Sequence, residues 1–303
     1  MLRDLQDEII KLKQEKQAVI LAHSYQSADI LEIADYIGDS YQLSVVAKDL
    51  QQSTVIMCGV RFMAETVKML SPEKTVILPV KQATCPMAEQ ISPEQVISFK
   101  QAHPEFKVVA YINTTTALKA VCDVCVTSSS ALKIVKAIPE QNILFIPDKN
   151  LGTYVQKMIP EKHIVVWDGY CPVHNAITVE DCKAAKQLYP DAKILMHPEL
   201  PAEVLTYADV IGSTAAIIDY AMNSNEPCII GTEKSIADYL NLVRPETRFY
   251  QLSKKLICPD MRITTLSDVY HALTGKGGER IELEKNIMQN ARKTIDEMIR
   301  LGQ

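Results

Sequence analysis

Three Cys-Pro dipeptides recur along the chain at almost equal intervals, and this spacing limits the possible folds more than any other feature. Cys85 and Cys171 lie 86 residues apart, and Cys171 and Cys258 lie 87 apart. An interval of this size is long enough for one small domain. We therefore expect three similar units, each presenting one cysteine at the same place. Three thiolates gathered at a threefold centre would leave one position open, because tetrahedral metal and iron–sulfur sites take four ligands.

The composition is that of a globular protein with two or three domains. The chain has 303 residues, of which 47% are hydrophobic and 23% charged. A chain of this length exceeds what one ordinary core can bury. The formal net charge of −5 argues against a nucleic acid or an anionic membrane as the main partner. We therefore expect small-molecule substrates, no nucleic acid and no membrane.

The expected location is the cytoplasm. No apolar run is long enough to span a bilayer, and residues 1–8 carry acids without the apolar stretch of a signal peptide. Without an export signal, the eight cysteines are expected to be thiols and not disulfides. Only Cys85, Cys171 and Cys258 precede a proline, which sets them apart from the other five.

Short apolar runs alternate with amphipathic segments throughout, which predicts βαβ units and parallel sheets. Strands are expected at 18–22, 54–58, 75–80, 107–111, 124–126, 143–147, 163–167, 193–196, 228–231 and 248–252. Helices are expected near 3–16, 28–37, 42–50, 61–70, 151–158, 179–188, 215–222, 233–243, 265–273 and 281–301, and after Ser92, Asn113, Ser130 and Glu199. The predicted fold class is α/β.

The cysteine spacing divides the chain into three units. The first comprises residues 1–83 together with 260–303, the second residues 84–169 and the third residues 170–259. In this division the last helix packs back onto the first unit.

Polar residues recur at matching places in the three units. Tyr111 and His197 each lie 26 residues after a Cys-Pro cysteine, and 86 residues before Tyr111 is Tyr25, close to His23. Three later turns also align, namely 38–40, 127–129 and 212–214. Ligands bind at the carboxyl ends of parallel strands. Hydroxyl groups at helix starts suit a phosphate or carboxylate, although any single one of these turns reads equally well as an ordinary helix cap.

Several short motifs, in this order along the chain, resemble those of the quinolinate synthase family. They are Leu21-Ala22-His23-Ser24-Tyr25-Gln26, Ile37-Gly38-Asp39-Ser40, Phe62-Met63-Ala64-Glu65, Ala83-Thr84-Cys85-Pro86-Met87-Ala88, Gly169-Tyr170-Cys171-Pro172-Val173-His174, His197-Pro198-Glu199, Gly212-Ser213-Thr214 and Gly231-Thr232-Glu233. Together with Cys258 they cover nearly the whole chain.

The resemblance implies three α/β/α units with short parallel sheets, related by pseudo-threefold symmetry, with the active site at their junction. It implies a [4Fe–4S] cluster held by Cys85, Cys171 and Cys258, with one iron open to substrate as a Lewis acid. The implied reaction condenses iminoaspartate with dihydroxyacetone phosphate to quinolinate, phosphate and water. Quinolinate feeds NAD biosynthesis, and an L-aspartate oxidase or dehydrogenase would supply the iminoaspartate.

The resemblance also implies roles for individual residues. Glu199 is the expected general acid or base, with burial raising its pKa into a useful range. The catalytic set further includes Tyr25, His23 and Tyr111. Substrate is expected to contact these residues and Glu199, together with Ser40, Asn113, Ser128, His197, Ser213 and Thr214.

Other residues have weaker assignments. His174, three residues after the expected ligand Cys171, is expected to contact the metal ligands and not the metal itself. Glu65 and Glu233 are left without a role. Cys122 and Cys125 form a C-x-x-C pair without a counterpart in the other units, and we expect both in the core.

Three alternative functions stay open at this point. The first is another kind of [4Fe–4S] enzyme, a hydro-lyase, which would act on a hydroxy acid and release no phosphate. A non-catalytic cluster protein would be a carrier with a fourth cysteine or a sensor with a nucleic-acid-binding segment, and the sequence shows neither. A zinc enzyme would use three thiolates and a water.

Overall fold

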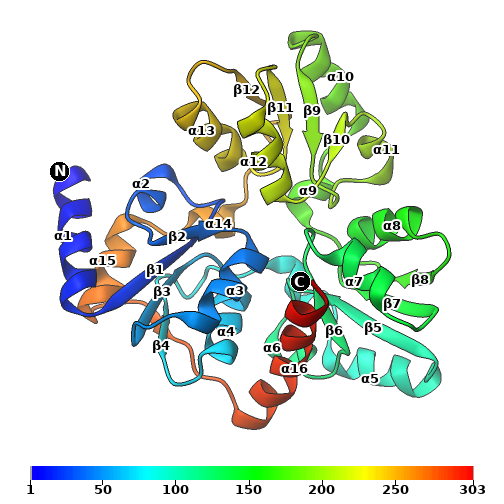
Figure 1. Cartoon of the computed structure of the whole chain (residues 1–303), viewed down its shortest axis with the longest axis horizontal. Coiled ribbons are helices and arrows are strands. Elements are labelled where there is room, and N and C mark those ends of the chain that lie inside the picture. Colours follow the sequence, from blue (N-terminus) through cyan, green and yellow to red (C-terminus); the bar gives the residue numbers. More distant parts are fainter. Residues whose placement is uncertain (1, 303) are drawn as a thin grey trace.

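Three sheets with the same strand order form the framework of the molecule (Figure 1). The computed structural model describes residues 2–302. In each sheet the first strand is central, the second lies on one side, and the third and fourth lie on the other. All pairings among these twelve strands are parallel. The expected α/β class with three similar units is therefore confirmed.

The first sheet contains β1 (Ala18–His23), β2 (Tyr36–Gly38), β3 (Thr54–Cys58), β4 (Thr75–Leu78) and the antiparallel edge strand β13 (Glu279–Arg280). The second contains β5 (Phe106–Tyr111), β6 (Val124–Val126), β7 (Asn142–Ile146) and β8 (His163–Val166). The third contains β9 (Lys193–Met196), β10 (Val210–Ile211), β11 (Cys228–Gly231) and β12 (Phe249–Gln251).

Helices connect the strands and cover the sheets (Figure 1). In chain order they are α1 (Leu2–Glu15), α2 (Ala28–Leu31), α3 (Ser40–Asp49), α4 (Arg61–Leu70), the 3-10 helix η1 (Pro86–Glu89), α5 (Pro93–Ala102), α6 (Thr116–Lys119), α7 (Ala131–Ala137), α8 (Lys149–Met158), α9 (Pro172–Asn175), α10 (Val179–Leu188), α11 (Ala202–Leu205), α12 (Thr214–Asn223), α13 (Lys234–Val243), α14 (Pro259–Arg262), α15 (Leu266–Thr274) and α16 (Lys285–Gly302).

An aspartate fixes the return of the chain to the sheet in every unit. The carboxylate of Asp123 accepts a hydrogen bond from the Val108 N–H at 2.8 Å, and Asp123 N–H donates to Val108 C=O at 3.1 Å. Asp35 and Asp209 make the same bonds to β1 and β9. The aspartate anchor, meaning this pair of hydrogen bonds, explains why the prediction of a helix over residues 28–37 is wrong. The helix stops after α2, because Asp35 and the following strand β2 bind to β1.

The strand pairing corrects the alignment of the repeats by two residues. Ala22 of β1, Ala110 of β5 and Met196 of β9 occupy the same register position against the third strand of their sheets. His23, Tyr111 and His197 are therefore equivalent, and so are Tyr25, Asn113 and Glu199. The expected match of Tyr111 with Tyr25 is wrong, because the first unit has two more residues between its strand end and its cysteine than the second.

The last helix, α16, lies between the first and second sheets, and not on the first unit alone as expected (Figure 1). It packs against α4 and also against α6, β6 and α7. Its buried residues Ala291, Ile295 and Met298 belong to one core cluster shared by these two units. Two further clusters fill the third unit on both sides of its sheet. Among residues 2–302, no helix has the length and apolarity that a membrane span requires.

We predict that Asp123→Ala lowers the free energy of unfolding by about 1–3 kcal/mol, because it leaves the Val108 N–H buried without its acceptor. Denaturant titration would measure the change. The control is Asp168→Ala, since the Asp168 side chain is 89% exposed and pairs only with the Lys149 side chain in the structure described. Equal stability of both variants and the parent would contradict the role of the anchor.

Candidate active site

Each Cys-Pro pair starts a short helix, and the three cysteines are held in the same way. Cys85, Cys171 and Cys258 are the extended residues immediately before η1, α9 and α14, and each following proline is the first helical residue. Proline suits this position because its fixed φ matches the helix and the first N–H needs no partner there. The repeated Cys-Pro motif thus places three thiols at three equivalent helix starts.

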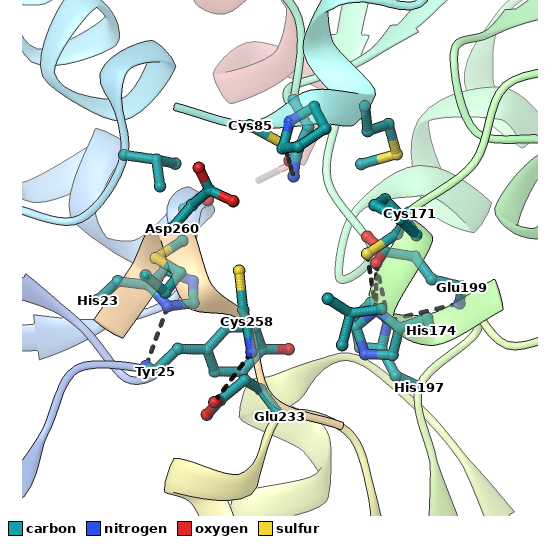
Figure 2. Close-up of a pocket in the computed structure, with 18 of the residues that line it drawn as sticks. His23, Tyr25, Cys85, Cys171, His174, His197, Glu199, Glu233, Cys258 and Asp260 are labelled. Atoms are coloured by element: carbon teal, nitrogen blue, oxygen red, sulfur yellow. Dashed lines mark hydrogen bonds and ion pairs between the residues drawn. The ribbon is translucent and has the colours of Figure 1, made fainter. Parts of the chain in front are cut away.

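The three cysteines line one cavity of about 330 Å³ at the junction of the units (Figure 2). Twelve of the thirteen residues predicted from the sequence contribute to its wall: His23, Tyr25, Ser40, Cys85, Tyr111, Asn113, Ser128, Cys171, His197, Glu199, Thr214 and Cys258. Asp39, Phe62, Glu233 and Asp260 also line it. Residues from all three sheets therefore meet where their central strands end.

Ser213 is the predicted residue that does not line the cavity. Its hydroxyl accepts a hydrogen bond from the Ala216 N–H at 3.2 Å and so caps α12. The next residue, Thr214, reaches the cavity, as do its equivalents Ser40 and Ser128. Each unit thus supplies a hydroxyl at this position of the turn after its second strand, and the second unit adds Thr127.

Glu199 lies between two histidines and is almost fully buried. Its Oε2 is 2.7 Å from His174 Nδ1 and 3.9 Å from His197 Nδ1. Burial acts to raise the pKa of Glu199, but His174 and His197, together with hydrogen bonds from His174 and Tyr111, outweigh it and lower that pKa to about 2. The expectation that burial raises this pKa is therefore wrong, because α9 brings His174 against the carboxylate. Glu199 is held as an ionised acceptor.

A chain of hydrogen bonds leads from His174 to Tyr25. His174 Nε2 is 3.1 Å from the Thr232 hydroxyl, which is 2.7 Å from the Tyr25 hydroxyl. Tyr25 also contacts the Thr214 hydroxyl at 2.9 Å, and its carbonyl accepts from Ser235 at 2.9 Å. Tyr25 from the first unit thereby joins the third unit. Thr232 is completely buried, and the sequence analysis gave it no role.

The two tyrosines of the cavity stay protonated at neutral pH. Burial and the charge of Glu199 raise the pKa of Tyr25 and of Tyr111. Tyr111 donates to Glu199, and Asn113, two residues later, lies with its Nδ2 3.9 Å from the Cys85 sulfur. Each phenol has one proton to donate, so a bound ligand would compete with Glu199 for that of Tyr111 and with the two threonine hydroxyls for that of Tyr25.

The loop that carries Asn113 is fixed by a buried lysine that the sequence analysis missed. Lys119 is fully buried, and its ammonium donates to the carbonyls of Ile112, at 2.7 Å, and Thr114. Burial lowers its pKa. The strand alignment places leucine at the equivalent positions of the other units, so the charge is a feature of the second unit alone. The sequence signal that could have revealed this role is the position of Lys119 among apolar residues of a predicted helix.

The residues left unassigned now have structural contacts. Glu65 accepts hydrogen bonds from the N–H and hydroxyl of Thr116, at 3.2 and 2.6 Å, and so joins α4 to α6. Cys125 contacts the Thr294 hydroxyl of α16, and Cys122 donates to the Leu118 carbonyl. Both cysteines are buried away from the cavity wall, which confirms that they belong to the core.

The donor set suits a metal. Burial raises the pKa of Cys85 to about 12 and of Cys258 to about 11, and raises that of Cys171 well above its ordinary value. These thiols need a neighbouring cation to ionise, which metal binding supplies. Cys171, His174 and Glu199 also place ligand atoms within 4.8 Å of one another. Cys85 and Cys258 line the same cavity but do not belong to this close group.

We predict that the metal-free protein loses about 2–3 kcal/mol of stability between pH 7.5 and 5.5. Burial lowers the pKa of His23 to about 3 and of His197 to about 4. In the unfolded chain both take up protons below about pH 6.5, so the unfolded state binds more protons and stability falls as the pH falls. Denaturant titrations at both pH values would measure the loss. The double variant His23→Gln, His197→Gln should flatten the dependence, and an unchanged slope would refute the assignment.

Comparisons with known proteins identify the family of the chain. The family model described as quinolinate synthetase A protein matches residues 7–300. The chain is 45% identical over 299 residues to a quinolinate synthase of Caldicellulosiruptor bescii, covering 98% of both chains. It is 46% identical over 302 residues to quinolinate synthases of Clostridioides difficile and Clostridium acetobutylicum, covering 99% of each chain. The chain belongs to the quinolinate synthetase A family of enzymes.

Proposed function

We propose that this chain is a quinolinate synthase, which condenses iminoaspartate with dihydroxyacetone phosphate to quinolinate, phosphate and two waters. The observation that carries the proposal is the convergence of three cysteines and the ionised Glu199 on one buried cavity. Membership of the family supports it.

Cys85, Cys171 and Cys258 would hold a [4Fe–4S] cluster, one thiolate from each unit. When bound, the cluster would supply a Lewis acid that polarises a substrate oxygen through its open iron. The three raised thiol pKa values fit this group, because each thiol is poised to ionise only when a cation is present.

The hydroxyls of Ser40, Ser128 and Thr214 would bind the carboxylate and phosphate oxygens of the substrates. Ser40 and Thr214 are the first residues of α3 and α12, where free N–H groups and the helix dipole favour anions. Lys255 is the one lysine or arginine described in the cavity wall, and it adds a positive charge. Asn113 and His23 would orient the bound molecules.

Glu199 would remove a proton from the condensing substrate and return it to the departing hydroxyl. Its low pKa keeps it deprotonated at neutral pH, and the contact with His174 offers a group to share the proton that it removes. His197 would keep Glu199 in place from its other side. Tyr25 and Tyr111, both protonated, would redirect their hydrogen bonds from Thr214 or Thr232 and from Glu199 to the imine and carbonyl groups that gain charge during the reaction.

Supply and location follow from the chemistry. Iminoaspartate hydrolyses readily, so an L-aspartate oxidase or dehydrogenase would have to generate it near this enzyme. We place both in the cytoplasm, where thiols stay reduced, and assign the product to NAD biosynthesis.

The test is quinolinate formation by oxygen-free protein from dihydroxyacetone phosphate and freshly generated iminoaspartate. The parent should form quinolinate, and Glu199→Gln should lower kcat by about 10²–10⁴-fold, as loss of a general base does. Glu203→Gln, an exposed acid four residues later, should retain parental activity. A parent that holds a [4Fe–4S] cluster but forms no quinolinate would overturn the proposal in favour of a hydro-lyase that acts on a hydroxy acid.

A further inference from the structure

Two buried carboxylates bind the backbone of two of the three cysteines. Asp148 Oδ2 accepts a hydrogen bond from the Cys171 N–H at 3.1 Å, and Glu233 Oε1 accepts one from the Cys258 N–H at 3.4 Å. Both acids have no exposed surface. Figure 2 shows Glu233 beside Cys258. Neither acid was given a role above.

The two acids occupy the same position in the repeat. In the third strand of each sheet, Ile146 and Gly231 pair with the equivalent central-strand residues Ala110 and Met196. Asp148 and Glu233 each lie two residues after these positions. Each also caps the following helix, through the N–H of Leu151 at 2.7 Å and that of Ser235 at 2.6 Å. One carboxylate therefore joins a helix start to the cysteine loop in the second and third units.

The first unit lacks this connection. Its equivalent residue, two after Cys58, is Val60, whose side chain has no acceptor atom. The loop before Cys85 is held instead by the Arg61 N–H, which donates to the Ala83 C=O at 2.8 Å, and by the Thr84 hydroxyl, which donates to Asp260 at 3.4 Å. A carboxylate therefore binds the cysteine N–H in the second and third units, whereas the first unit holds its cysteine loop by other hydrogen bonds.

We propose that Asp148 and Glu233 are positioning residues for the metal centre, each fixing its cysteine through the backbone N–H. The inference rests on the proposed [4Fe–4S] cluster. Groups that hold ligands in place typically change metal affinity by 10–100-fold when they are removed. A carboxylate can accept from both N–H donors, whereas an amide keeps one oxygen and turns its NH₂ group toward the other donor.

The experiment compares the parent with Asp148→Asn and Glu233→Gln, all purified without oxygen. Iron release to a chelator should be roughly 10-fold faster or more in both variants, and the electron paramagnetic resonance spectrum of the reduced cluster should change. Asp148→Glu, which keeps a carboxylate, should recover part of the retention. If Asp148→Asn fails to fold, Glu233→Gln provides the same test in the third unit.

Two controls separate positioning from general stability. Asp168→Asn removes an exposed acid three residues before Cys171. Thr178→Ala removes the hydroxyl that caps α10 by accepting a hydrogen bond from the Asp181 N–H at 3.3 Å. Both should release iron and give spectra as the parent does. If the parent holds a cluster and the two acid variants match it, this inference is overturned while the proposed function stands. A parent without iron and sulfide would overturn both.

Discussion

One backbone hydrogen bond, repeated in each unit, sets the position of the cysteines on which the site depends. The first N–H of the helix after the third strand donates to the carbonyl two residues before the cysteine. The pairs are Arg61 to Ala83 at 2.8 Å, Lys149 to Gly169 at 2.7 Å, and Lys234 to Leu256 at 2.9 Å. The proline after each cysteine then starts a short helix, so the thiol is left at the edge of the cavity. These three bonds place each cysteine loop beside the helix start that follows the third strand of its unit.

The units share a framework and differ in the residues placed on it. Two residues after the equivalent strand ends they carry Tyr25, Asn113 and Glu199. In the proposed reaction Tyr25 would donate a hydrogen bond, Asn113 would orient a ligand and Glu199 would accept a proton. At the helix-start position they carry Val60, Asp148 and Glu233. The first two units share a core through α16, whereas the third has cores of its own and meets the first through the hydrogen bonds of Tyr25. The same backbone position therefore carries different side chains in the three units, which suits the proposed reaction between two different substrates.

The sequence predicts the parts of the site that local pattern determines. Cysteine spacing located all three thiols, and apolar runs located the strands whose ends carry the polar residues. It failed where a contact between distant segments decides the outcome. The strand β2 was predicted as helix because only pairing with β1 reveals it, and the pKa of Glu199 was predicted in the wrong direction because His174 arrives from another segment. Asp148 and Thr232 were missed for the same reason, since each acts on a residue that is distant in the sequence.

The most direct test of the account is the iron and sulfide content of oxygen-free protein, measured for the parent and for Cys85→Ala, Cys171→Ala and Cys258→Ala. The matched control is Cys182→Ala, a buried cysteine outside the cavity wall. We predict about four iron and four sulfide per chain in the parent and the control, as a [4Fe–4S] cluster requires, with loss of the cluster in each of the three variants. One zinc per chain in the parent, or a cluster that survives removal of any one of the three cysteines, would contradict the account.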